Sequence, residues 1–219
     1  MKRKFPGSLL AALAALTIWF SLVSPLPAAN LVTNASFEED NNGDGLPDGW
    51  TFSATTAHPI WEHQGKIYSS FGNPQFQLDS HLVCDGRRSL MLQATELSCG
   101  LVSQRLSIHG GKTYCLKVWL KSRNLSSPEV GTAVHLIFDR GTSKYLDGPR
   151  TLLASGETPW FLLTRVFTVP EQATQVELIL ELYFAKGQTW WDAVSLEPAG
   201  DSRDIISIDQ PSFESLLCG

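Results

Sequence analysis

The sequence of 219 residues lacks the motifs that mark common catalytic sites. It contains no GxSxG turn, no HExxH pair and no glycine-rich phosphate-binding loop. Glu177 and Glu181 stand four residues apart on one predicted strand, so their Cβ atoms lie about 13 Å apart. Glycosidases need two carboxyl groups about 5 Å apart, or up to about 9.5 Å apart in the inverting class. We therefore predict that the chain is not an enzyme.

Cysteine is scarce, with four residues in the whole chain and no CxxC pair. This spacing excludes the usual zinc sites. Cys84 and Cys99 flank a predicted strand, and the extended residues between them span more than about 25 Å. A direct bridge between these two cysteines is therefore not expected. At least two of the four cysteines are expected to be buried or free thiols.

Basic residues are in the minority, with 17 against 22 acidic ones and a formal net charge of −5. Three of the basic residues and none of the acidic ones belong to the first 29 residues, so the rest of the chain is more acidic still. Nucleic acids and anionic membranes both select proteins with a basic surface. We therefore expect neither as a partner.

One mostly apolar run, from Leu9 to Val23, lies near the N-terminus. It follows the basic Lys2-Arg3-Lys4, precedes Pro25-Leu26-Pro27-Ala28-Ala29, and is short for a membrane span. This order predicts a signal peptide over residues 1–29, export to the cell envelope or beyond it, and no membrane insertion after cleavage. An uncleaved N-terminal anchor is the alternative.

Sustained helical periodicity is absent outside this run, and apolar residues instead alternate with polar ones. The expected strands are residues 30–37, 89–93, 102–108, 113–122, 132–140, 160–169, 176–184 and 189–196, while residues 50–87 form a long irregular stretch. Short strands at this spacing predict an all-β fold over residues 30–198, a two-sheet antiparallel β-sandwich or jelly roll.

Residues 40–48 place oxygen-bearing side chains at alternate positions around a glycine. The side chains are Asp40, Asn42, Asp44 and Asp48. A tight loop of this kind aims successive oxygens at one point, and Ca²⁺ binds about six to eight oxygen ligands. The EF-hand pattern fails later, because Thr51 stands where the last Glu is required. We expect structural Ca²⁺ in this loop, and the alternative is a plain Asn/Asp/Gly turn.

Several short motifs follow one another between Asn30 and Pro198. They read FEE, DGW, GRRSLML, VSQRLSIHGGKTYCLKVWLKS, WFLLTRVFTVP, VELILEL and WWDAVSL. Their order and spacing resemble carbohydrate-binding modules of families four, nine and twenty-two. The resemblance implies a galactose-binding-like jelly roll with a structural Ca²⁺ near its first and last strands, and it places Glu38 and Asp192 among the metal ligands.

The resemblance also implies a polysaccharide or other glycan as the partner. Sugars present flat CH faces and hydroxyl groups, so their sites combine aromatic rings with polar side chains. Glu181 matches the position of a sugar-binding glutamate of family twenty-two. The expected ligand-binding residues are Trp119, Lys117, His135, Asp139, Glu181 and Tyr183, with Trp61 closing one end of the site. The alternative is that Trp119 and Tyr183 only shield the back of a sheet.

Three functions remain open. The first is a secreted, non-catalytic glycan-binding module, which exposed aromatic residues beside polar groups would favour. The second is an envelope protein-interaction sandwich, which a flat apolar patch would favour. The third is the binding part of a glycoside hydrolase whose catalytic domain is absent. Residues 199–219 form a C-terminal tail, and the chain is either a free-standing module or a truncated fragment.

Overall fold

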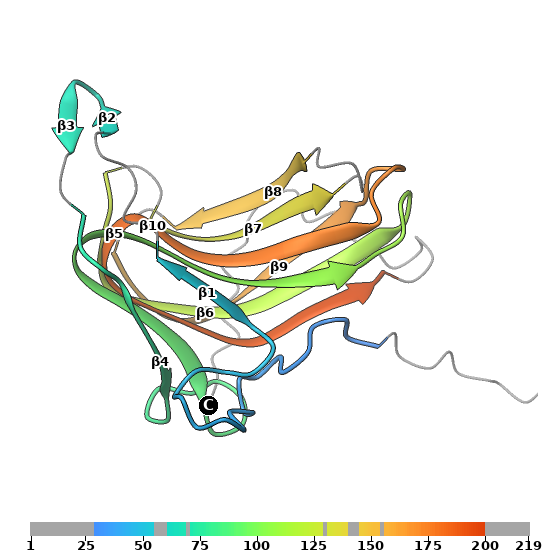
Figure 1. Cartoon of the computed structure of the whole chain (residues 1–219), viewed down its shortest axis with the longest axis horizontal. Coiled ribbons are helices and arrows are strands. Elements are labelled where there is room, and N and C mark those ends of the chain that lie inside the picture. Colours follow the sequence, from blue (N-terminus) through green and yellow to red (C-terminus); the bar gives the residue numbers. More distant parts are fainter. Residues whose placement is uncertain are drawn as a thin grey trace, which may run out of the picture.

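The chain folds into strands that lie in two layers, as the computed structural model in Figure 1 shows. The structure describes residues 29–54, 61–68, 71–128, 131–139, 145–153 and 156–199. The predicted signal peptide and C-terminal tail lie outside these ranges, apart from residues 29 and 199. None of the described residues forms a helix long and apolar enough to cross a membrane. The strands are β1 (Thr51–Ala54), β2 (Trp61–His63), β3 (Lys66–Tyr68), β4 (Gln75–Asp79), β5 (Ser89–Ser107), β6 (Thr113–Ser126), β7 (Gly131–Asp139), β8 (Tyr145–Leu153), β9 (Gly156–Thr168) and β10 (Gln175–Pro198).

The two longest strands, β5 and β10, each run through both layers. Figure 1 shows β10 following one layer, bending at the left and returning along the other. In what we call the upper sheet, residues 99–107 of β5 pair with residues 175–183 of β10, flanked by β1 on one side and by β7 and β8 on the other. In the lower sheet, residues 89–98 of β5 pair with residues 185–191 of β10, flanked by β4 on one side and by β6 and β9 on the other.

The bend of β10 depends on two unusual backbone positions. Phe184 has a φ of 48°, in the left-handed region, and the register shifts on both sides of Ala185 as it does at a β-bulge. The Phe184 ring is buried and packs edge-on against Phe71, with ring centroids 5.3 Å apart. Gly187 has a φ of 117°, and a Cβ there would lie 2.4 Å from the backbone oxygen of Asn124. Only glycine fits this close approach of two strands.

The apolar core lies between the two sheets and is filled by alternate residues of the long strands. In β10, Leu178, Leu180 and Leu182 are completely buried, and in β6 Leu116 and Leu120 are nearly so. Burying one such side chain contributes roughly 1.5–3 kcal/mol to folding. The residues between them point away from the core, so each sheet has an outer face on which a second set of side chains alternates.

The structure confirms the predicted all-β antiparallel sandwich but changes several strands. The predicted strand at residues 30–37 is wrong, because Asn34 and Phe37 have positive φ values of 47° and 57°. The Phe37 side chain is completely buried and packs on the Trp50 ring at 5.2 Å, so this segment reaches the core without pairing as a strand. β8 was not predicted. Residues 89–93 and 102–108 are parts of β5, and residues 176–184 and 189–196 are parts of β10.

The cysteines agree with the expectation that Cys84 and Cys99 are not joined. Cys84 is disulfide-bonded, whereas Cys99 and Cys115 are free thiols. Cys218 lies outside the described residues. Burial raises the pKa of both free thiols, so neither is a reactive thiolate at neutral pH.

We expect Gly187→Ala to destabilise the protein more than Gly156→Ala. The two glycines have φ values of 117° and 112°, so alanine is strained at either position. At Gly187 the added Cβ would also clash with the backbone of Asn124. At Gly156 no atom lies within 4 Å of the added Cβ. Urea unfolding should show a loss of about 1–3 kcal/mol for Gly156→Ala and a larger loss for Gly187→Ala. Equal losses would mean that the contact with β6 does not constrain the bend.

Candidate ligand-binding faces

The outer face of the upper sheet carries a polar row across three strands. We call it the upper outer face. The register places on it Glu177, Ile179, Glu181 and Tyr183 of β10, Ser103 and Arg105 of β5, and His135, Ile137 and Asp139 of β7. The row along β10 from residue 175 to residue 183 is about 27 Å long. Within the row, Ile179 and Glu181 are buried, whereas Glu177 and Tyr183 are partly exposed.

Glu177 is held in place on this face by two side chains of β5. The Ser103 hydroxyl donates to Oε1 of Glu177 at 2.9 Å, and Nη2 of Arg105 lies 3.8 Å from Oε2. The Glu177 side chain remains 30% exposed. A carboxylate that is oriented and still accessible can accept hydrogen bonds from hydroxyl groups of a ligand. Ser103 and Arg105 are absent from the sequence prediction, because only the pairing of β5 with β10 brings them to Glu177.

Glu181 lies on the same face but is only 3% exposed. Burial raises the pKa of the neighbouring Cys99 thiol, and the Glu181 carboxylate raises it further, which places the two groups close together. The Tyr183 ring packs edge-on against Phe184 at 4.5 Å, so it supports the bend of β10. Of the two glutamates on this face, Glu177 is therefore the one that offers its carboxylate to a ligand.

The structure brings four of the predicted ligand-binding residues onto this one face. His135 stands opposite Ile179 in the register, and Asp139 stands opposite Gln175. Both side chains are partly exposed. Together with Glu181 and Tyr183 they follow the same row, so their placement agrees with the sequence analysis. Their role in binding stays a prediction.

Trp119 and Lys117 do not belong to this group. They lie on β6, which pairs with the lower part of β10 and with β9 and makes no ladder with β7. Both side chains point outward from the lower sheet, opposite Leu162 and Thr164 of β9. The prediction of one site that includes Trp119, His135 and Glu181 is therefore wrong, because consecutive strands in the sequence enter different sheets.

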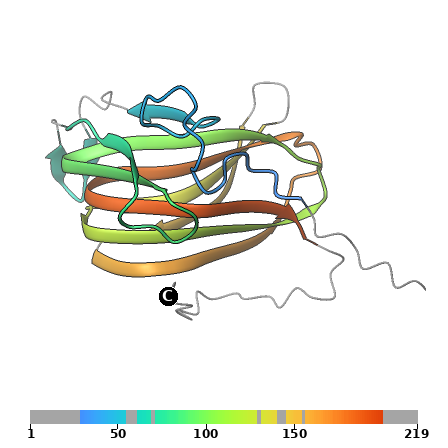
Figure 2. The same cartoon turned by 90° about the horizontal axis from the view of Figure 1, so that it is seen from below.

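Trp61 begins β2, which pairs with β3 in a separate hairpin. Figures 1 and 2 show this hairpin beyond the end of the sandwich at which β5 and β10 bend. The Trp61 side chain lies outside the described residues, so its proposed closure of the site stays a prediction.

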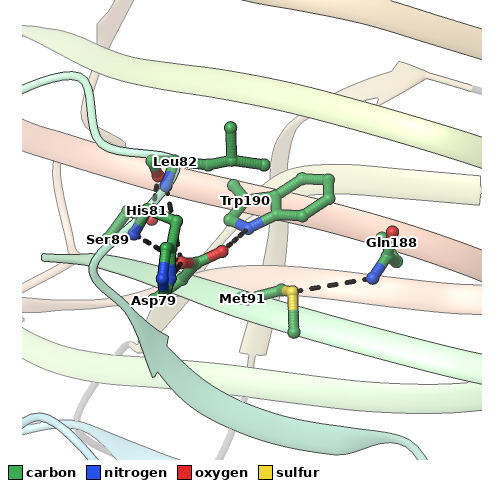
Figure 3. A network of polar contacts seen from close by, with 7 residues as sticks. All are labelled: Asp79, His81, Leu82, Ser89, Met91, Gln188 and Trp190. Carbon is green, nitrogen blue, oxygen red and sulfur yellow. Dashed lines mark hydrogen bonds and ion pairs between the residues drawn. The ribbon is translucent and has the colours of Figure 1, made fainter.

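The outer face of the lower sheet, which we call the lower outer face, is partly covered by the turn at residues 79–88. Figure 3 shows the Trp190 indole N–H reaching Asp79, at 2.8 Å from Oδ2. The other oxygen of Asp79 accepts the backbone N–H groups of His81 and Leu82. Burial raises the pKa of Asp79, but these donors outweigh it and the pKa lies below its usual range. Trp190 is 1% exposed and therefore acts as a support for this turn.

Glu38 and Asp192 both bind the end of the same turn. Oδ2 of Asp192 accepts the N–H groups of Cys84 and Asp85 at 2.8 and 2.9 Å, and Oε1 of Glu38 accepts those of Arg87 and Arg88. The turn thus joins the N-terminal segment to the last strand, which is the structural task that the resemblance assigns to Ca²⁺.

The fit of these two carboxylates to a metal ion is poor. The Arg87 guanidinium lies 3.4 Å from Glu38 Oε2, and a cation already beside this carboxylate disfavours a second one. The described residues hold no group of three or more His, Cys, Asp or Glu side chains placed to bind a metal. We therefore derive no role for a metal between Glu38 and Asp192.

The loop at residues 40–48 is connected by its own side chains. Oδ1 of Asp40 and Oδ1 of Asn42 both accept the N–H of Asp44, at 3.1 and 3.0 Å, so these two oxygens lie close together. Asp48 is turned the other way and accepts from both the backbone and the side chain of Asn41. Hydrogen bonds therefore connect three of the four predicted ligands, Asp40, Asn42 and Asp44, to one another, whereas Asp48 bonds to Asn41 instead.

Comparison with known proteins gives similarity at the level of structure only. No protein-family model and no curated protein matches the sequence. TmCBM61, solved in complex with β-1,4-galactotriose, has a TM-score of 0.50 and 12% identity over 78% of this chain and 100% of its own. A CBM4 structure has a TM-score of 0.50 and 16% identity over 76% of this chain and 99% of its own. The enzymatically active domain of tailspike protein 4 of bacteriophage CBA120 has a TM-score of 0.54 and 16% identity. The match covers 78% of this chain but only 21% of the tailspike chain.

These likenesses show the fold. The chain shares an all-β jelly-roll fold with these two carbohydrate-binding modules, which agrees with the architecture that the motifs predicted.

The unfolding free energy should fall as the pH rises from about 4 to about 6, because of Asp192. This carboxyl is completely buried, and burial raises its pKa from 3.8 to about 6 despite its backbone N–H donors. The native state therefore holds this proton more tightly than the unfolded state, and its stabilising effect is complete below pH 4 and lost above pH 6. The difference is about 3 kcal/mol, since one pKa unit corresponds to about 1.4 kcal/mol.

Urea unfolding across this pH range, in the presence of a chelator, measures the effect. Asp192→Asn serves as the control, because the amide does not titrate. The variant should be less stable, since its NH₂ group cannot accept the N–H groups of the turn, and the fall in stability with rising pH should be absent from it. The same pH dependence in both proteins would contradict the assignment to Asp192.

Proposed function

We propose that the protein is an exported, non-catalytic module that binds a polysaccharide on its upper outer face. The observation that carries this proposal is the fixed and accessible Glu177 carboxylate within a polar row on the sheet of a carbohydrate-binding fold. Ser103 and Arg105 on one neighbouring strand contact Glu177, and His135 lies on the other neighbouring strand.

The chemistry of this face suits the hydroxyl groups of a neutral glycan. A sugar hydroxyl both donates and accepts hydrogen bonds, and the row offers a carboxylate acceptor beside a guanidinium donor. Ile137 lies between the polar groups of β7, is partly exposed, and supplies apolar surface for the CH faces of the sugar.

The non-catalytic part of the proposal is supported by the separation of the two glutamates. Glu177 and Glu181 face the same way four residues apart, which corresponds to about 13 Å along a strand. This exceeds the separation that either class of glycosidase uses.

Binding to soluble polysaccharides should depend on Glu177. In affinity electrophoresis against β-1,4-galactan, xylan and β-glucan, we expect wild type to be retarded by at least one of them. Glu177→Gln should weaken that binding about tenfold, because it removes a charged acceptor worth about 1.4 kcal/mol. Glu197→Gln is the matched control, since Glu197 lies on β10 but faces outward from the lower sheet.

The melting temperature of each variant shows whether a loss reflects folding. Equal retention of wild type and Glu177→Gln, with both folded, would place the binding site elsewhere. No retardation of the wild type by any polysaccharide would contradict the proposed function itself.

Calcium at the loop of residues 40–48 is a separate proposal. It is supported by the gathering of the Asp40 and Asn42 oxygens around one backbone N–H, and by the tie from Asn42 to Asp44. A bound cation would replace these internal hydrogen bonds with oxygen–metal contacts. It would hold the loop against β4, which the loop already contacts through the Leu78 N–H and the Gly45 carbonyl.

Thermal melts in calcium and in EDTA test this proposal. Calcium at about a hundred times its Kd should stabilise the protein by about 3 kcal/mol. Asp44→Asn should reduce the shift, whereas Glu157→Gln, at an exposed position on β9, should not. An identical wild-type melt in both solutions would show that residues 40–48 form a turn without a metal.

A further inference from the structure

Strand β6 presents three basic side chains and one tryptophan on the lower outer face. Lys117, Trp119, Lys121 and Arg123 occupy alternate positions, and the core-facing residues between them are buried. Successive side chains on one face of a strand stand about 7 Å apart, so the row is about 20 Å long. The chain as a whole carries a net charge of −5, so this concentration of basic groups is a local feature.

The three cations of this row are not used in ion pairs within the described part of the chain. Ion pairs join Arg87 to Glu38 and Arg105 to Glu177 instead. Leu162 and Thr164 of β9, which stand opposite Trp119 and Lys117, are uncharged. The two carboxylates nearest along β10 are those of Asp192, which is buried beneath the turn, and Glu197, which stands opposite Cys115 at the end of the row.

Arg123 and Lys121 are held in position by the protein itself. The Arg123 guanidinium lies over the Trp190 ring, 5.4 Å from its centroid, and Nζ of Lys121 lies 3.5 Å from the Thr158 carbonyl oxygen. Trp190 is in turn fixed by Asp79 (Figure 3). A cation that is already oriented loses less conformational entropy when it binds an anion.

Beyond Arg123 the face continues as a ladder of amides. Gln188 stands opposite Arg123 in the register. Its side-chain amide donates to Gln93 at 3.2 Å, and the Gln93 amide donates in turn to Gln75 at 2.9 Å. A pocket of about 110 Å³ opens beside Gln75 and Gln93. Amides offer both donors and acceptors, which is what recognition of hydroxyl groups requires.

We propose that the lower outer face, built around Lys117, Trp119, Lys121 and Arg123, is a second binding surface that takes an anionic polysaccharide. Basic side chains at regular intervals match a polymer with a carboxylate on each sugar unit. A single exposed ion pair contributes little, so binding requires several of them in a row. Trp119 lies within the row and supplies the flat aromatic surface that a sugar ring needs.

An anionic polysaccharide is favoured over other polyanions by two features of this surface, its aromatic ring and its row of amides. The aromatic ring and the amide ladder recognise hydroxyl-bearing rings, which lipid headgroups and polyphosphates do not present as an extended chain. The surface is separate from the upper outer face, so the proposal does not depend on the neutral glycan proposed there.

The experiment compares two ligands that differ only in charge. Polygalacturonate and its fully methyl-esterified form have the same sugar backbone, and binding of the full chain to each is measured at low ionic strength. We expect polygalacturonate to bind and the ester to bind at least tenfold more weakly. Binding should be lost at about 1 M salt, where the Debye length is about 3 Å.

Two double variants with the same change in charge locate the surface. Lys117→Gln with Lys121→Gln should weaken polygalacturonate binding at least tenfold. Lys112→Gln with Arg165→Gln, at exposed positions outside the row, should change it less than twofold. Trp119→Phe should keep the binding and Trp119→Ala should reduce it, with melting temperatures measured for both. Glu177→Gln on the upper outer face should have no effect.

Equal losses in the two double variants, or equal binding of both polysaccharides, would overturn the proposal. So would binding of single-stranded DNA or of phosphatidylserine vesicles as tight as that of polygalacturonate, because the surface would then recognise charge alone. Failure here leaves the retention of neutral polysaccharides unchanged, and the two proposals are therefore tested separately.

Discussion

The pairing of β10 on both of its edges is the interaction on which the rest of the structure depends. The strand is 24 residues long, pairs with β5 over most of its length, and forms its other ladder with β7 in the upper sheet and β6 in the lower. Both layers of the sandwich contain it. Its bend at Phe184 and Gly187 is therefore a requirement of the fold rather than a local irregularity.

The bend also decides which side chains face outward. In the upper sheet the odd-numbered residues Glu177 and Glu181 point away from the core, whereas in the lower sheet the even-numbered Trp190 does so and Trp191 is buried inside. One extra residue at the bulge changes the alternation. Without it, the indole that supports Arg123 and binds Asp79 would belong to the core.

Alternation within a strand could be predicted from the sequence, but strand neighbours could not. The outward direction of Trp119 and Lys117 follows from the period of two in residues 113–122, and the structure agrees. Their partners depend on which sheet each strand enters, which is decided by long-range contacts that leave no local signal. For the same reason the predicted ligand-binding residues include the buried Glu181 but not Glu177 with its neighbours Ser103 and Arg105. The irregular path of residues 30–37 likewise follows from the burial of Phe37 against Trp50.

The two outer faces point in opposite directions and carry different charges. A protein that binds one polymer on each face is bivalent, so it would connect separate polysaccharide chains into a network instead of coating them. Cross-linking is greatest when the number of protein molecules is similar to the number of binding sites on the polymers. An excess of protein leaves each protein molecule attached to a single polysaccharide chain. The viscosity of a mixture of neutral and acidic polysaccharide would then rise and fall again as protein is added.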